Sequence, residues 1–201
     1  ADNGFAISSN IGTKSHTTQE DAAENYIQSG ILTNETKTSW ATQVGYTQPN
    51  YSGSVMFNVK SNGWSDTYYE AAGSEGAASF QDQYTSVGLR GWWRPEDPDS
   101  QLPSVSLGYD TTDFDGTSAD AWFVGLNWTD SFNADDKIGV AFGQPTTNED
   151  ADVSPFAYEV YYSFKANDSV TMTPTIFGGS DRNGVAGGDI FGAVFETTFK
   201  F

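Results

Sequence analysis

The chain has 201 residues and a formal net charge of −18, so it carries too few cations to neutralise nucleic-acid phosphates. It has no cysteine and only one histidine, which rules out disulfides, thiolate metal sites and a histidine cluster for zinc. Its 21 glycines, 14 phenylalanines and 10 tyrosines are typical of strands and tight turns, and no apolar run is long enough for a spanning helix, so the composition predicts an all-β protein.

Alternation of large apolar residues with small or polar ones predicts ten strands. In chain order they are Gly4–Gly12, Trp40–Thr47, Tyr51–Lys60, Tyr84–Arg94, Pro103–Asp110, Ala121–Thr129, Ile138–Gly143, Pro155–Lys165, Val170–Phe177 and Ile190–Phe201. This alternation fits a soluble sandwich as well as a transmembrane barrel, because both architectures separate an apolar face from a polar one.

The spacing of the aromatic residues favours the barrel. Trp122 and Trp128 share one phase of their strand, as do Phe156 and Phe164, and at ~3.3 Å per residue these pairs span roughly 20 and 26 Å. The apolar band between the two aromatic girdles of an outer-membrane barrel is about 25 Å tall. The predicted lipid-facing girdle residues are Trp40, Tyr46, Trp93, Trp122, Trp128, Phe156 and Phe164.

The predicted connections alternate between long and short. The long ones are Thr13–Ser39, Ser61–Gln83, Thr111–Asp120, Gln144–Ser154 and Gly178–Asp189. Each is longer than the connections next to it, as in barrels with short turns at one end and long loops at the other. The pattern therefore predicts an antiparallel up-and-down transmembrane β-barrel, with about ten strands in this chain.

The last strand places Phe195, Phe199 and Phe201 in one phase. This ending resembles the C-terminal signal by which the barrel-assembly machinery recognises bacterial outer-membrane proteins. Longer runs resemble one family, the cyanobacterial (Som-type) outer-membrane porins related to the OprB-like carbohydrate-selective porins. Those runs are Ser86–Glu96, Leu102–Tyr109, Val124–Trp128, Gly139–Pro145 and Ser169–Phe177.

The resemblance implies an outer-membrane location among lipid and lipopolysaccharide, a homotrimer of barrels, and passive diffusion of small hydrophilic solutes or inorganic ions. Family members also carry a signal peptide, an N-terminal S-layer-homology domain that grips peptidoglycan, and further strands. We therefore expect residues 1–201 to be the C-terminal portion of a larger porin, without that domain and the first strands. A ten-stranded barrel that closes Gly4–Gly12 onto Ile190–Phe201 is the alternative.

If the aromatic phase faces lipid, the opposite phase lines the lumen, and its charges set the ion preference. The pore-lining candidates are Lys60, Arg90, Arg94, Glu159 and Glu196. Acidic residues outside the strands are expected to concentrate cations at the pore mouth. Asp110, Asp113 and Asp115 form a weak Ca²⁺ candidate that lacks the distal bidentate glutamate of a calcium loop. No other cofactor is expected.

Two other functional classes share features with this sequence. Glu159 and Glu196 are the acids predicted well inside strands, and paired carboxylates can perform acid–base catalysis. No serine or histidine motif accompanies them, so we do not expect an enzyme. The main alternative is a soluble acidic β-sandwich, a lectin-like and Ca²⁺-dependent binding module whose core is the aromatic face; it would be extracted without detergent.

Overall fold

A computed structural model of the chain describes residues 3–15, 36–61, 83–97, 100–114, 117–149 and 151–200. Its strands are β1 (Phe5–Ser15), β2 (Thr36–Gln48), β3 (Tyr51–Ser61), β4 (Gln83–Trp93), β5 (Ser104–Phe114), β6 (Thr117–Thr129), β7 (Lys137–Asn148), β8 (Phe156–Asn167), β9 (Val170–Ser180) and β10 (Ile190–Phe199). All ten predicted strands are confirmed. A 3-10 helix, η1 (Arg182–Gly184), precedes β10. No helix in the described ranges has the length and hydropathy to cross a membrane.

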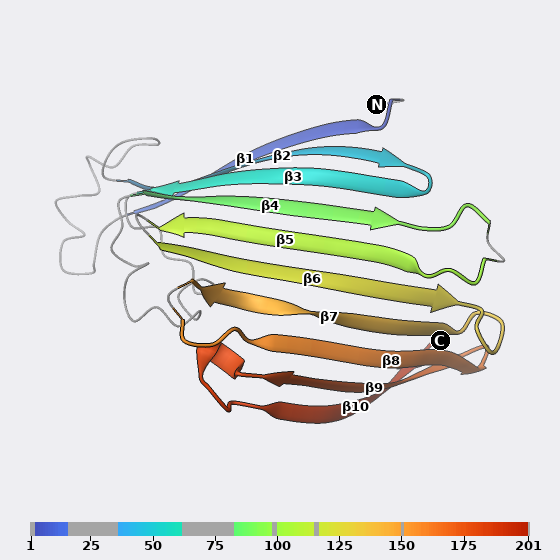
Figure 1. Ribbon diagram of the computed structural model, residues 1–201. Helices are drawn as coiled ribbons and strands as arrows, with labels where there is room; N and C mark the ends of the chain where they lie inside the picture. Colours follow the sequence, from blue (N-terminus) through green and yellow to red (C-terminus); the bar gives the residue numbers. More distant parts are fainter. Residues whose placement is uncertain are drawn as a thin grey trace.

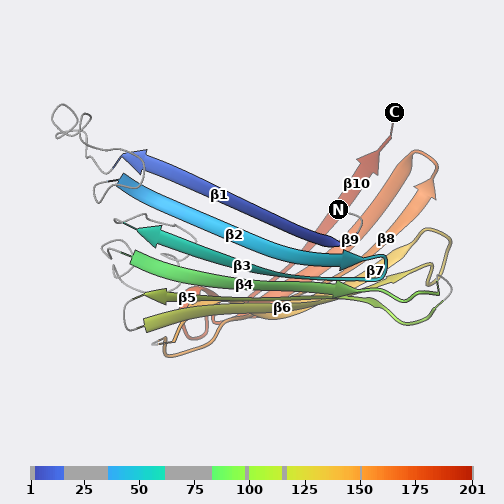
Figure 2. The same cartoon turned by 90° about the horizontal axis from the view of Figure 1, so that it is seen from above.

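The strands form one antiparallel sheet whose spatial order is the order of the sequence (Figure 1). Every strand pairs with the strand that follows it, which confirms the predicted up-and-down meander. The sheet is curved and twisted, so that β8–β10 are steeply inclined to β1–β3 when it is viewed from above (Figure 2). It is not closed, because β1 and β10 are its two edges and do not pair with each other.

The strands are long. They contain between 10 and 13 residues, about twice the usual five or six of a globular protein. At ~3.3 Å per residue they extend roughly 33–43 Å. Each strand therefore holds two or three more alternations than a typical sandwich strand, and the sheet is correspondingly tall.

The predicted long connection Thr111–Asp120 is wrong. β5 continues to Phe114 and β6 begins at Thr117, so only residues 115 and 116 separate them, whereas residues 94–103 separate β4 from β5. The threonines and aspartates of this segment suggested a loop by their polarity, but they continue the ladder as far as the pair Phe114–Thr117. The alternation of long and short connections therefore fails at this hairpin.

Cross-strand register assigns each strand residue to one of two faces, because directly opposite residues of an antiparallel pair point the same way. The apolar face is defined by the odd-numbered residues of β3 and the residues opposite them. One row across it is Ile7, Val44, Val55, Leu89, Tyr109 and Trp122. The polar face is defined by the even-numbered residues of β3. One row across it is Ala6, Gly45, Ser54, Arg90 and Gly108.

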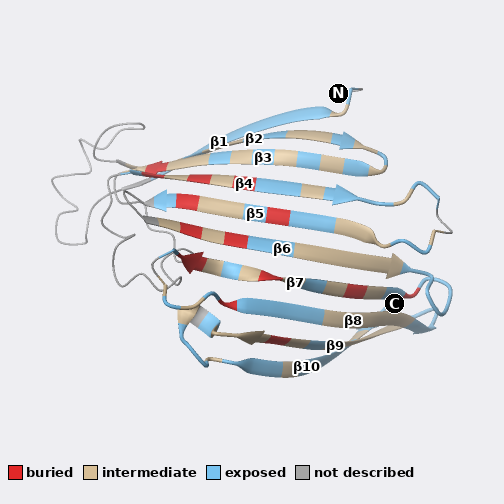
Figure 3. Ribbon diagram, viewed as in Figure 1, coloured by how far each residue is buried: buried red, intermediate tan, exposed pale blue. Residues whose placement is uncertain are grey.

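On β3 and the start of β4, burial is inverted with respect to a soluble sheet (Figure 3). On β3, Val55 and Phe57 are exposed, while Ser54 and Asn58 are half-buried and Lys60 is buried. The start of β4 repeats the pattern, with its buried residues on the polar face. On these strands the polar face is thus the more enclosed of the two, whereas on β1, β8 and β10 both faces carry exposed residues.

Candidate functional site

The polar face carries most of the charge within the strands. By register it holds the basic residues Lys37, Lys60, Arg90, Lys137 and Lys165 and the acidic residues Asp110, Glu159 and Glu196. The only charged residues of the apolar face in the described strands are Asp113 and Asp120, which lie beside the β5–β6 hairpin. The face that is more enclosed is therefore also the hydrophilic one.

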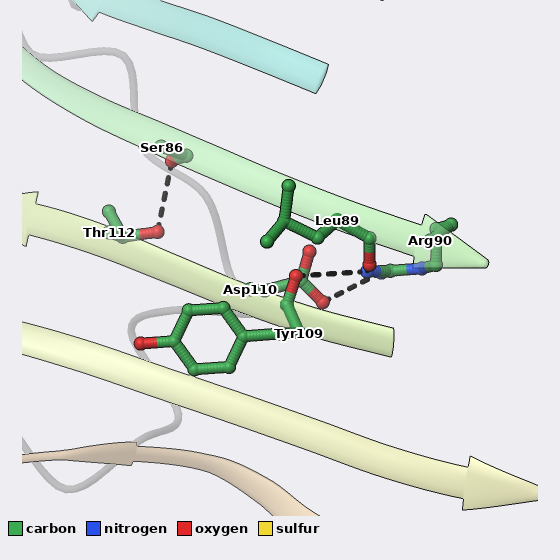
Figure 4. A network of polar contacts seen from close by, with 6 residues as sticks. All are labelled: Ser86, Leu89, Arg90, Tyr109, Asp110 and Thr112. Atoms are coloured by element: carbon green, nitrogen blue, oxygen red, sulfur yellow. Dashed lines mark hydrogen bonds and ion pairs between the residues drawn. The ribbon is translucent and has the colours of Figure 1, made fainter. Parts of the chain in front are cut away.

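An ion pair between Arg90 of β4 and Asp110 of β5 lies on this face (Figure 4). The Arg90 Nη2 donates to Asp110 Oδ2 at 2.7 Å, and Nη1 donates to the carbonyls of Leu89 at 2.8 Å and Tyr109 at 3.2 Å. The guanidinium carbon also lies 5.7 Å from the ring centroid of Phe123. These contacts hold the guanidinium in place, and Asp110 compensates its charge.

A groove of about 550 Å³ extends from this pair across the polar face. Its floor consists of small residues, which include Ala121, Ala141, Gly143 and Ala157. One wall is formed by Arg90, Asp110 and Phe123, and the other includes Phe177 and Ile190. Glu159 of β8 also lines the groove and lies directly opposite Phe177 of β9.

Of the five predicted pore-lining residues, the structure brings only Arg90 and Glu159 into this groove. Lys60 is buried at the far end of β3, with its ammonium 5.3 Å from the ring centroid of Tyr84. Arg94 lies beyond the end of β4, where its Nε donates to the Pro49 carbonyl at 2.8 Å. Glu196 of β10 accepts a hydrogen bond of 3.2 Å from the Thr198 hydroxyl. These three lie elsewhere on the sheet.

Buried polar contacts fill the end of the polar face next to the β5–β6 hairpin. The Thr112 hydroxyl donates to Ser86 Oγ at 2.9 Å (Figure 4), and neither residue is exposed to solvent by more than 6%. Tyr84, Ala119 and Ala121 are buried at the same end. Because their hydroxyl groups are hydrogen-bonded to each other, Thr112 and Ser86 can be buried there although they are polar.

Aromatic side chains on the polar face were missed by the sequence analysis. Three of them lie directly opposite a glycine, in the pairs Gly108–Phe123, Gly139–Tyr161 and Gly192–Phe177. A β-carbon on these glycines would lie only 2.1, 2.0 and 2.5 Å from the opposing ring. Each ring therefore covers a bare backbone position, an arrangement known to stabilise glycine in sheets. The signal that could have revealed it is an aromatic residue in the polar phase, facing a glycine in the paired strand.

All seven predicted girdle residues lie on the apolar face by register. Their ladder partners are on that face too, for example Ile11 opposite Trp40, Val105 opposite Trp93 and Met172 opposite Phe164. Phe195 and Phe199 lie on the same face and are exposed. Phe201, the third residue of the predicted assembly signal, lies outside the described residues.

The predicted calcium cluster does not form among the described residues. Asp110 and Asp113 are an odd number of positions apart in β5, so their side chains point to opposite faces, and Asp110 is paired with Arg90. Asp115 lies outside the described residues. Within the ranges that the structure describes, no group of three or more His, Asp or Glu side chains could hold a metal ion.

The connection between β6 and β7 is organised around the buried carboxylate of Asp136. It accepts hydrogen bonds from the backbone N–H groups of Ser131, Phe132 and Asn133 at 2.7–3.0 Å, and from the Tyr162 hydroxyl at 2.9 Å. Burial by itself would raise the pKa of Asp136, but these donors outweigh it and lower the pKa below the usual value. The neighbouring Asp135 is exposed, and its hydrogen bond to Lys165 at 2.6 Å lowers its pKa as well.

No known protein family, curated protein or solved structure matches this chain. What its geometry defines is a class: an all-β protein built on one ten-stranded antiparallel meander with an apolar and a polar face, of which the polar one is the more enclosed along β3. The resemblance to cyanobacterial porins stays a prediction.

Proposed function

We propose that this chain forms the barrel of a porin, alone or together with further strands; a porin is a passive channel that lets small hydrophilic solutes or inorganic ions cross an outer membrane. The observation that carries the proposal is the inverted burial along β3, where Val55 and Phe57 are exposed and the polar residues between them are more enclosed. A transmembrane barrel has this pattern because its apolar side chains face lipid and its polar ones face the lumen. In a soluble sandwich the apolar side chains would be the enclosed ones.

The extent of the exposed apolar surface supports a lipid environment. Monomeric soluble proteins rarely expose contiguous apolar patches larger than a few hundred Å². Large apolar side chains are exposed from one edge of this sheet to the other, among them Ile7 on β1, Leu89 on β4, Leu107 on β5 and Phe195 on β10. Strands of 10–13 residues are also long enough to cross the hydrocarbon core when tilted.

The register supports closure with tilted strands. A row perpendicular to the strands starts at Phe5, the first residue of β1, and reaches β10 at Phe191. Phe199, the last residue of β10, lies 199 − 191 = 8 positions beyond this row, at the end of the sheet where β1 begins. The drift is about 26 Å over roughly 43 Å of sheet width, an incline near 30°. Strands of closed barrels tilt by 35–45° through the same kind of stagger. Because lipid tolerates no open sheet edge, β1 and β10 both gain a strand partner in the inserted form.

In this proposal the mechanism is diffusion through water along the polar face. Pore width and the fixed charges of Arg90, Asp110 and Glu159 set the selectivity, without a chemical step. The outer-membrane location, the homotrimer and recognition of the C-terminal phenylalanines by the assembly machinery belong to the same proposal. They rest on the family resemblance.

Single-channel recording in planar bilayers tests the proposal. Detergent-purified protein is expected to insert and give stepwise openings, in multiples of three for a trimer. Ala157→Trp, on the polar face, should lower the conductance of each step. Ala193→Trp, on the apolar face, should leave it unchanged. A chain that is soluble without detergent and never inserts would contradict the channel and favour the acidic β-sandwich.

A further inference from the structure

The groove on the polar face carries one uncompensated negative charge. Arg90 and Asp110 form an ion pair at 2.7 Å, so their charges cancel. The Arg90 guanidinium is also bound to two backbone carbonyls, which keeps it away from the opposite wall. Glu159 lines the same groove, is exposed, and has no hydrogen bond or ion pair with any described residue. The groove therefore favours a ligand that carries a positive charge.

The surroundings of Glu159 suit an organic cation better than a metal ion. Phe177 lies directly across the ladder from Glu159, and Phe123 forms part of the opposite wall. The ring of Phe123 already has a cationic group, the Arg90 guanidinium, 5.7 Å from its centroid, which leaves Phe177 as the ring for a cationic ligand. The face of an aromatic ring attracts the charge of an alkylated ammonium group, and the ring also makes apolar contacts with its alkyl groups. A bare metal ion instead requires several oxygen ligands.

The dimensions of the groove fit such a ligand. The floor of the groove has no protruding side chains, because it is made of small residues. Ala141 lies opposite Glu159 on the neighbouring strand, and Ala157 lies opposite Gly143. Phe123 on β6 and Phe177 on β9 are three strands apart, roughly 14 Å across the sheet, so a small ion beside Glu159 contacts Phe177 and not Phe123. The volume of about 550 Å³ admits an ammonium ion with several alkyl carbons.

We propose that this groove binds a small alkylammonium ion, with Glu159 as its counter-ion and the ring of Phe177, on the neighbouring strand, against its alkyl groups. The inference rests on the proposed function in one respect: in a porin the groove lies in the lumen, so the site selects organic cations among the permeating solutes.

Binding of tetraethylammonium chloride to the whole chain in detergent micelles, measured by titration calorimetry, tests the site. Glu159→Gln is expected to weaken binding about tenfold, the order of effect for loss of the counter-ion of a partly desolvated cation. Phe177→Leu should weaken it severalfold. Glu196→Gln is the matched control, because it removes another polar-face carboxylate outside the groove, and binding should be unchanged.

Equal affinity of the wild-type protein and Glu159→Gln overturns the inference, as does tighter binding of thiocyanate than of tetraethylammonium. Circular dichroism of each variant shows that its sheet is intact. Because binding in micelles does not require conduction, the two proposals fail separately. Binding without conductance in bilayers contradicts the porin, and conductance with unaltered binding by Glu159→Gln contradicts the site.

Discussion

The apolar and polar faces of the sheet differ in what fills them and in how enclosed they are. Phe57 on the apolar face is 48% exposed, whereas Lys60 on the polar face of the same strand is 6% exposed. The apolar face consists largely of big side chains, several of them in ring contact, such as Phe5 and Tyr46 with centroids 4.6 Å apart. The polar face combines small residues with hydrogen-bonded pairs and with rings that cover glycines. Along β3, enclosure therefore does not follow hydrophobicity, which is the arrangement expected when the surrounding solvent is lipid.

A charge placed on each face in turn should give the largest difference. Val55→Arg puts a guanidinium among exposed apolar side chains, while Ser54→Arg puts the same group on the polar face one residue away. In lipid vesicles Val55→Arg should lower the free energy of unfolding by about 2–4 kcal/mol, the cost of a cation near the bilayer midplane. Urea unfolding curves measure both variants. A greater loss for Ser54→Arg would reverse the assignment of the faces.

A methyl group added on each face should give the next largest difference. A β-carbon at Gly143 would lie 2.1 Å from the Trp122 carbonyl oxygen, so Gly143→Ala must displace the backbone of β6. We expect a loss of about 1–3 kcal/mol in unfolding free energy, typical of overpacking. Gly53 has no atom within 4 Å of that position, and Gly53→Ala is the control. Equal stability of the two variants would contradict the close packing of the polar face.

The two faces were predictable from the sequence to different degrees. Alternation is a local signal, so the strands and the apolar phase of residues such as Trp122 and Phe156 could be predicted. The ends of β5 and β6 could not, because the threonines and aspartates near Phe114 have the composition of a loop and form strand only through pairing. The Arg90–Asp110 pair was also out of reach, since it depends on the register between two strands. Arg94 was predicted to line the pore with Arg90, because the two residues share one phase of the alternation. The prediction failed because β4 ends at Trp93, one residue before Arg94.

The pH dependence of stability distinguishes the β6–β7 connection from both faces. The folded-state pKa of Asp136 is below its ordinary value of 3.8, so its contribution to stability is complete above that pH and is lost as the pH falls through the lower folded value. Asp136→Asn should therefore reduce stability at pH 6 and flatten the decline between pH 5 and pH 2. Urea midpoints measured across this range check it, with the exposed Asp152→Asn as control. An unchanged acid limb would show that the carboxylate does not organise the turn.

The smallest effect is expected at the exposed pair of Lys165 and Asp135. Lys165→Gln removes the hydrogen bond that lowers the pKa of Asp135, so that pKa should rise toward its ordinary value in an NMR titration. The side chains are 51% and 67% exposed, and exposed ion pairs contribute little, so the urea midpoint should not move measurably. A clear loss of stability would show that this pair matters more than its exposure indicates.

The most direct test of the inside-out arrangement is a single-cysteine scan of β3, Tyr51–Ser61, in lipid vesicles; the native chain contains no cysteine. Spin labels at each position report collisions with oxygen, which partitions into lipid, and with a water-soluble nickel chelate. Odd-numbered positions such as Val55 should favour oxygen and even-numbered ones such as Ser54 the chelate, alternating along the strand. Odd-numbered positions shielded from both reagents, with even-numbered positions open to the chelate, would make the apolar face a protein core and contradict the porin.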